Sequence, residues 1–109
     1  MCIIASELGY IELTKPGQIG SVTIPQGSLV RFTNKRSVEV WPASNVHPTH
    51  KNYPGSDITK CGTLEQSQIF DSCIGMSTDS ITSFTFNELG TWQYHDHLHP
   101  NVKGTIVVQ

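Results

Sequence analysis

The sequence predicts an all-β fold in which short strands form a sandwich. Of its 109 residues, 29 are Thr, Ile or Val and only 2 are Ala. Because β-branched residues pack well on a pleated sheet and Ala is the strongest helix former, this balance argues against an all-α fold. Nine Gly and six Pro supply the frequent turns that a sandwich of short strands requires.

Alternating apolar and polar side chains predict the strands in chain order. We expect strands at residues 10–14, 19–25, 28–33, 37–41, 80–87, 91–98 and 103–108, with turns at Gln26–Gly27, Leu89–Gly90 and Pro100–Asn101. Residues 42–78 interrupt this rhythm and contain three Pro and two Cys. We therefore expect a long loop here. Loops of this length usually carry a function or are held in place by other contacts.

Length and charge limit the classes of function. A chain of 109 residues predicts a single domain over residues 1–109. The formal net charge is −2, which disfavours nucleic acid or an anionic membrane as the main partner. The apolar runs are only a few residues long, so no transmembrane segment is expected.

Three cysteines are present, and none belongs to a CxxC pair. Cys61 and Cys73 bracket a polar stretch with little core of its own, and a disulfide between them would close a short loop. The alternative is a pair of buried free thiols. A disulfide would imply an oxidising compartment, periplasmic or extracellular, with a leader that is not part of this chain. Cys2 would then be the odd thiol.

All five histidines fall in two short clusters. His47 and His50 lie in the long loop as HPTH, and His95, His97 and His99 lie at the end of a late strand as HDHLH. Residues two apart in a strand share a face, so His95 and His97 form a pair of nitrogen donors. Neutral imidazole suits copper, zinc, nickel and iron. The two clusters together predict a metal site, with the loop folded over one face of the sheet.

Asp96 points to the face opposite that pair, and its role stays open at this stage. It could be an oxygen ligand, an outer acceptor that orients a His ring, or a structural hydrogen-bond acceptor. His99 lies just past the strand, where it could be either a metal ligand or a solvated loop residue. A Ser hydrolase is disfavoured because no GxSxG motif occurs.

Two segments of the chain resemble the cupredoxins. VTIPQGSLVRFTN resembles the strand, Gly turn and Asn-ended strand of the first half of a cupredoxin. FTFNELGTWQYHDHLHPNVKGTIVV resembles the C-terminal half, with its aromatic strand, ligand loop and final strand. The resemblance covers roughly residues 10–38 and 80–109 and implies a cupredoxin-like Greek-key β-sandwich with a long loop at residues 42–78.

At most one ligand of a blue-copper centre is in its ordinary place in this sequence. Such a centre uses a His, a Cys, a second His and a weak axial Met. By the resemblance, the first His would fall near Val40, where there is none unless an offset alignment brings in His47. The Cys position corresponds to Asp96, and the second His matches His99. The axial position falls near Gly104, and no Met lies beyond Met76. Without a copper–thiolate bond the chain should not be a blue electron carrier.

The remaining imidazoles resemble the ligands of the multicopper oxidases. In those enzymes HxH pairs flank the Cys and hold type 2 and type 3 copper, and HPTH resembles their HPxH segment. Carried over here, the resemblance implies a site of His47, His50, His95 and His97, with His99 and Asp96 as further candidates. The closing donors come either from the chain's own loop, which we favour, or from another subunit of an oligomer.

We therefore expect an extracytoplasmic copper-binding protein for copper handling or sequestration rather than an enzyme. Nitrogen donors favour Cu(II) over Cu(I), and zinc is an alternative. The partner would be the metal ion, with a copper-delivery or redox protein as a second partner. The rival interpretations are a copper oxidoreductase acting on oxygen, nitrite or superoxide, a non-blue electron-transfer domain, and a metal-free domain that binds a partner.

Overall fold

The computed structural model describes residues 2–5, 8–13 and 21–109, and side chains from residue 21 onward. The described residues form eight strands and two short 3-10 turns, confirming an all-β fold. The strands are β1 (Cys2–Ala5), β2 (Leu8–Leu13), β3 (Val22–Ile24), β4 (Ser28–Asn34), β5 (Pro42–Ser44), β6 (Ile81–Phe86), β7 (Gly90–Asp96) and β8 (His99–Val108), and the turns are η1 (Ile58–Lys60) and η2 (Gln66–Gln68).

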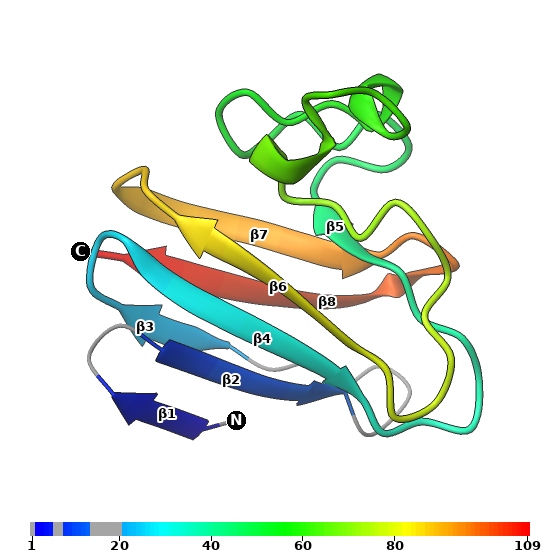
Figure 1. The fold of residues 1–109 in the computed structure, drawn as a ribbon, viewed down its shortest axis with the longest axis horizontal. Coiled ribbons are helices and arrows are strands. Elements are labelled where there is room, and N and C mark those ends of the chain that lie inside the picture. Colours follow the sequence, from blue (N-terminus) through cyan, green and yellow to red (C-terminus); the bar gives the residue numbers. More distant parts are fainter. Residues whose placement is uncertain (1, 6–7, 14–20) are drawn as a thin grey trace.

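Two four-stranded sheets face each other, with strand orders β1-β2-β4-β6 and β3-β8-β7-β5 (Figure 1). Strand β2 runs parallel to β4, and β3 runs parallel to β8, while the other neighbours are antiparallel. The segment that joins β5 to β6 lies beside the edge of the sandwich at which β6 ends one sheet and β7 and β5 end the other (Figure 1).

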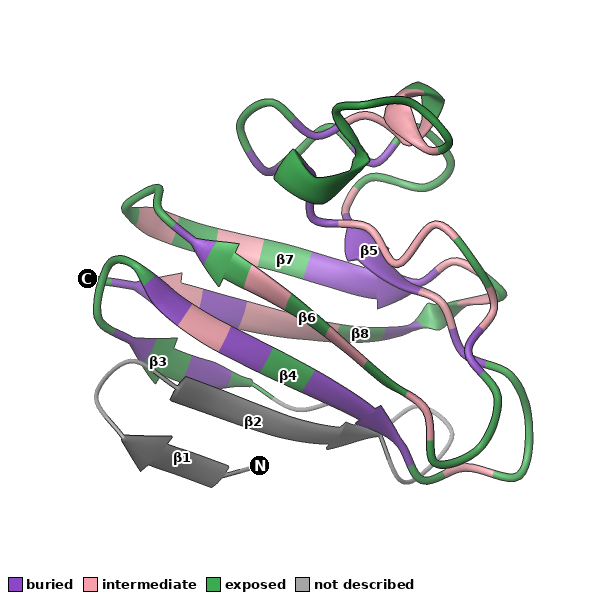
Figure 2. Cartoon of the chain, viewed as in Figure 1, coloured by how far each residue is buried: buried purple, intermediate pink, exposed green. Residues whose placement is uncertain are grey.

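The core lies between the sheets and extends into the long loop. Figure 2 shows buried residues on β4 and β7, the strands that face each other there. The rings of Phe32 and Tyr94 lie edge to face with centroids 5.3 Å apart. The loop contributes Tyr53, Phe70 and Met76 to the same cluster. The loop therefore closes one edge of the sandwich, and burying these side chains favours its attachment to the sheets.

Two sequence predictions of strands need correction. Residues 37–41 do not form a strand, and only Val40 makes an isolated bridge, with Met76. The amide of Asn34 donates to the carbonyls of Val38 (2.8 Å) and Met76 (2.9 Å), which holds this segment as a bend. The ladder with β7 begins instead at Pro42.

The last strand also starts earlier than predicted. Asp96 pairs with His99, so the reversal falls at residues 97–98, and Pro100 and Asn101 lie within β8. The other strand predictions agree with β2, β3, β4, β6 and β7 apart from their ends, and residues 14 and 19–20 lie outside the described residues.

The predicted disulfide between Cys61 and Cys73 is confirmed, with Cα atoms 5.5 Å apart. It joins the two ends of the loop segment that contains η2. Among the residues that the structure describes, no helix has the length and apolarity to cross a membrane.

Candidate metal site

Strand β7 and the turn after it position two histidines on one side of the strand end. Tyr94 belongs to the core, and since side chains alternate along a strand, His95 lies on the other face. His95 is nonetheless 1% exposed, because the long loop covers it. His97 follows the strand, and its backbone N–H donates to the carbonyl of Trp41 (2.7 Å). This bond fixes the turn and keeps His97 on the side of His95.

The long loop supplies the other two imidazoles directly after β5. The backbone N–H of His50 donates to the carbonyl of Val46 (2.7 Å), which closes a turn that contains His47. His50 has a φ of 62°, the left-handed region that non-Gly residues rarely adopt, and it is fully buried. His47 is exposed. Such backbone strain persists only where the surroundings hold it, and here contacts to the His50 ring do so.

The structure brings these four side chains together. One nitrogen from each of His47, His50, His95 and His97 lies within 4.8 Å of the others. The rings of His50 and His95 and those of His50 and His97 have centroids 4.8 Å apart. His47 closes the group, with its ring centroid 4.9 Å from that of His97. The loop of this chain is therefore able to complete the set without a second subunit.

Outer hydrogen bonds determine which nitrogens face inward. The Nδ1 of His50 lies 2.6 Å from Oδ2 of Asp71, and the Nδ1 of His95 lies 2.8 Å from Oδ1 of Asn45. Because these oxygens can only accept, each neutral ring must carry its proton on Nδ1 and present a lone pair at Nε2. The Nε2 of His95 is buried and has no hydrogen-bond partner. The Nε2 of His50 lies 3.0 Å from Nδ1 of His97.

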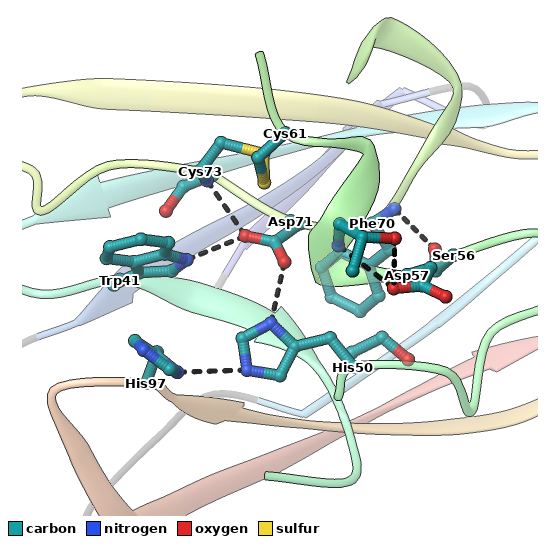
Figure 3. A network of polar contacts seen from close by, with 12 residues as sticks. Trp41, His50, Ser56, Asp57, Cys61, Phe70, Asp71, Cys73 and His97 are labelled. Atoms are coloured by element: carbon teal, nitrogen blue, oxygen red, sulfur yellow. Dashed lines mark hydrogen bonds and ion pairs between the residues drawn. A yellow bond between two sulfur atoms is a disulfide. The ribbon is translucent and has the colours of Figure 1, made fainter. Parts of the chain in front are cut away.

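Asp71 connects this cluster to the rest of the loop. Its Oδ2 meets His50, while its Oδ1 accepts from the indole Nε1 of Trp41 (2.6 Å) and from the backbone N–H of Cys73 (2.8 Å) (Figure 3). The side chain of Asp71 is fully buried. A buried carboxylate that receives a ring N–H is the usual outer partner of a metal-binding histidine, because it orients the ring and raises its basicity.

Burial and the neighbouring imidazoles lower the pKa values of His95 and His97. Desolvation, followed by the neighbouring rings of His50, His47 and His97, lowers the pKa of His95 to about 4. Burial and two of the same rings also lower the pKa of His97, against the opposing charge of Asp71. At neutral pH these two groups are unprotonated, and their lone pairs are available to a cation.

The other two candidate ligands lie outside the cluster of four. Asp96 accepts from the backbone N–H groups of Trp41 (2.8 Å) and Leu98 (3.0 Å), and its Oδ2 lies 2.7 Å from Nδ1 of His99. The guanidinium of Arg36 lies 3.8 Å from the same carboxylate. Asp96 therefore acts here as a structural hydrogen-bond acceptor that also orients the ring of His99.

Sequence reasoning did not find Asp71, Asn45 or Trp41. Asp71 lies in the stretch FDSC, where nothing in the spacing distinguishes it from the other polar residues of the loop. Asn45 stands two residues before His47, and Trp41 just before β5. Their roles arise from the path of the loop, which brings position 71 beside position 50.

No family model matches the chain, and no curated protein does. Solved structures do share its fold. A structure described as a novel purple cupredoxin from Nitrosopumilus maritimus is 21% identical with a TM-score of 0.65, over 93% of this chain and 99% of that one. Amicyanin from Paracoccus versutus is 17% identical with a TM-score of 0.62, over 97% of this chain and 85% of that one.

These likenesses agree with the strand order, the two facing sheets and the sequence resemblance noted above. The chain thus has the cupredoxin fold.

Proposed function

We propose that this chain binds one copper ion, as Cu(II), through His47, His50, His95 and His97, and that it serves copper handling or sequestration outside the cytoplasm. The observation that carries the proposal is the Nε2 of His95, a buried acceptor without a partner that lies among three other imidazoles. A buried polar atom of this kind costs roughly 1–3 kcal/mol unless a ligand satisfies it. A cation would satisfy all four lone pairs at once.

The donor set supports copper over other metals. Four neutral imidazoles suit Cu(II), whereas Cu(I) prefers thiolate or thioether sulfur. No sulfur atom belongs to the cluster of four histidines. Zinc also accepts imidazole ligands and is the competing ion. The disulfide between Cys61 and Cys73 supports an oxidising compartment such as the periplasm or the cell exterior.

The direct experiment is metal analysis of the purified protein after loading from an equimolar mixture of Cu(II) and Zn(II). We expect one copper per chain after passage over a chelating column. One zinc per chain would support the metal site but contradict copper as its ion. The absence of stoichiometric metal would contradict the whole proposal.

A second candidate function is redox catalysis at the same ion. The exposure of His47 favours it, because a metal bound beside this ring could be reached from solvent and could exchange a ligand there. Copper-loaded protein would then consume superoxide, or oxygen in the presence of ascorbate, with many turnovers per copper. The control is the His95→Ala variant mixed with the same amount of copper. If both proteins consume the substrate at the same rate, the site binds copper without catalysing the reaction.

A further inference from the structure

A second group of metal-binding atoms lies next to the histidine cluster. The Sγ atoms of Cys61 and Cys73 and a carboxylate oxygen of Asp71 all lie within 4.8 Å of one another. The sulfurs are joined in the disulfide, so they are not ligands in this state. Both cysteines are only partly buried, so a small reductant can reach the bond.

Bonds other than the disulfide also hold the segment around Cys73. Ser72 donates its backbone N–H to the carbonyl of Pro42 (2.9 Å), and Met76 donates to the carbonyl of Val40 (2.7 Å). Met76 is also a buried member of the core. This part of the loop is therefore attached to β5 and to the segment before it on both sides of Cys73.

The position of Cys61 is also held by other bonds. Its backbone N–H donates to the carbonyl of Ile58 (3.1 Å), and Ile58 donates to the carbonyl of Thr49 (2.9 Å). The ammonium of Lys60 donates to the carbonyl of Gly55 (2.7 Å). Two separate sets of hydrogen bonds, neither of which involves the sulfur atoms, thus hold the backbone at the two cysteines.

We propose that reduction of the Cys61–Cys73 disulfide creates a second metal site, made of the two thiolates and Asp71, for a thiophilic divalent ion of the zinc class. Two small thiols reduce the bond, giving the two cysteine thiols and one small-molecule disulfide. The divalent ion then displaces two protons as the two sulfur–metal bonds form. Cysteine sulfur with a carboxylate oxygen is a ligand combination that zinc accepts.

Asp71 would be common to both sites. It already receives the ring proton of His50, so a metal at the thiolates would compete with that histidine for the same carboxylate. Opening the disulfide would then weaken the support of the histidine cluster while a sulfur site appears. The thiol redox state would move the metal preference of the protein from nitrogen-bound copper to sulfur-bound zinc.

The test uses Cd(II) as the probe, because cadmium–thiolate bonds absorb in the ultraviolet and cadmium–imidazole bonds do not. All proteins carry Cys2→Ser, which removes the odd thiol. One sample stays oxidised and one is reduced with a phosphine, which takes its oxygen from water as the two thiols form. We expect a thiolate absorption that saturates at one Cd(II) per chain in the reduced protein only, and that Zn(II) displaces.

Three variants sharpen the result. The Cys61→Ser/Cys73→Ser pair should show no absorption. Asp71→Asn should bind Cd(II) more than about tenfold more weakly, because loss of a ligand costs more than loss of an outer carboxylate. His95→Ala should keep the absorption, which separates this site from the histidine cluster. A reduced protein with no thiolate absorption, or one that loses its near-ultraviolet circular dichroism on reduction, would overturn the proposal.

Discussion

The two sides of the strand end at residues 95–99 carry opposite kinds of polar chemistry. On one side the Nε2 of His95 is buried without a partner among three other imidazoles. On the other side Asp96 receives two backbone N–H groups and lies against His99 and Arg36. The first side holds one unsatisfied acceptor, whereas on the second side the Asp96 carboxylate is hydrogen-bonded and the buried atom without a partner is a donor, Nη1 of Arg36.

This difference shows how alternation along one strand divides a motif. HDHLH reads as one run of metal-binding residues, yet neighbouring side chains point to opposite faces. Asp96 accepts backbone hydrogen bonds and stabilises the end of the sandwich. The imidazoles that the long loop can cover carry the candidate site. The two sides can therefore be perturbed separately, and the first two predictions use one side as the control for the other.

The largest effect is expected from removing two imidazoles. The His95→Ala/His97→Ala variant should lose stoichiometric copper, because only His47 and His50 would remain of the four donors. Loss of affinity should exceed the roughly 100-fold that removal of an outer partner costs. The measurement is copper retained in competition with a chelator, with His99→Ala as the control that should bind normally. One tight copper in the double variant would contradict the ligand assignment.

The reverse experiment removes the hydrogen-bonded side. Asp96→Ala should lower the free energy of unfolding by about 3 kcal/mol, because two backbone donors lose a buried acceptor and the guanidinium of Arg36 loses the carboxylate paired with it. Denaturant unfolding of the metal-free protein measures this loss. Copper affinity of the variant that remains folded should stay within a few-fold of the original. A loss of copper as large as in the double His variant would place Asp96 among the ligands.

The third prediction concerns the carboxylate that supports His50. Asp71→Asn should weaken copper binding by about 10–100-fold, since the ring of His50 loses its charged acceptor. The matched control is Asp79→Asn, which removes an exposed carboxylate that pairs with Lys35. Equal copper affinities of the two variants would mean that Asp71 does not support the site.

The smallest effect is a pH dependence of the metal-free protein. Burial lowers the pKa of His95 to about 4 from 6.5, so the unfolded chain takes up a proton more readily than the folded one. Stability is therefore full above pH 6.5 and falls as the pH drops towards 4, by about 1 kcal/mol between pH 7 and pH 5.5. Unfolding experiments on the His95→Gln variant should show a weaker decline. An identical decline in the variant would assign the effect to other groups.

Much of the fold could be predicted because its strands show a local alternation of apolar and polar residues. The alternation around Val30 and Phe32 in β4 and around Tyr94 in β7 indicates strands with one buried face, and the structure places these side chains in the core. The prediction of a strand at residues 37–41 was wrong because the side-chain amide of Asn34 donates a hydrogen bond to the carbonyl of Val38, which holds this segment as a bend. A hydrogen bond of that kind has no periodic signal.

The candidate site could be predicted in part. Spacing alone pairs His95 with His97, and the convergence of HPTH on them required only that the loop fold back over the sheet. The supporting residues could not be found in the same way. Asp71 lies 21 residues from His50, and the path of an irregular loop brings them together. Tertiary contacts of this kind depend on how Phe70 and Tyr53 pack, which local sequence does not reveal.

The most direct test of the account is the electron paramagnetic resonance spectrum of the protein loaded with one Cu(II), in which only the histidines carry ¹⁵N. The account predicts an axial, non-blue signal whose superhyperfine lines arise from at least three nitrogens and change pattern between ¹⁴N and ¹⁵N histidine. A spectrum that is insensitive to the label, or an intense visible thiolate-to-copper band, would contradict a copper site made of imidazoles.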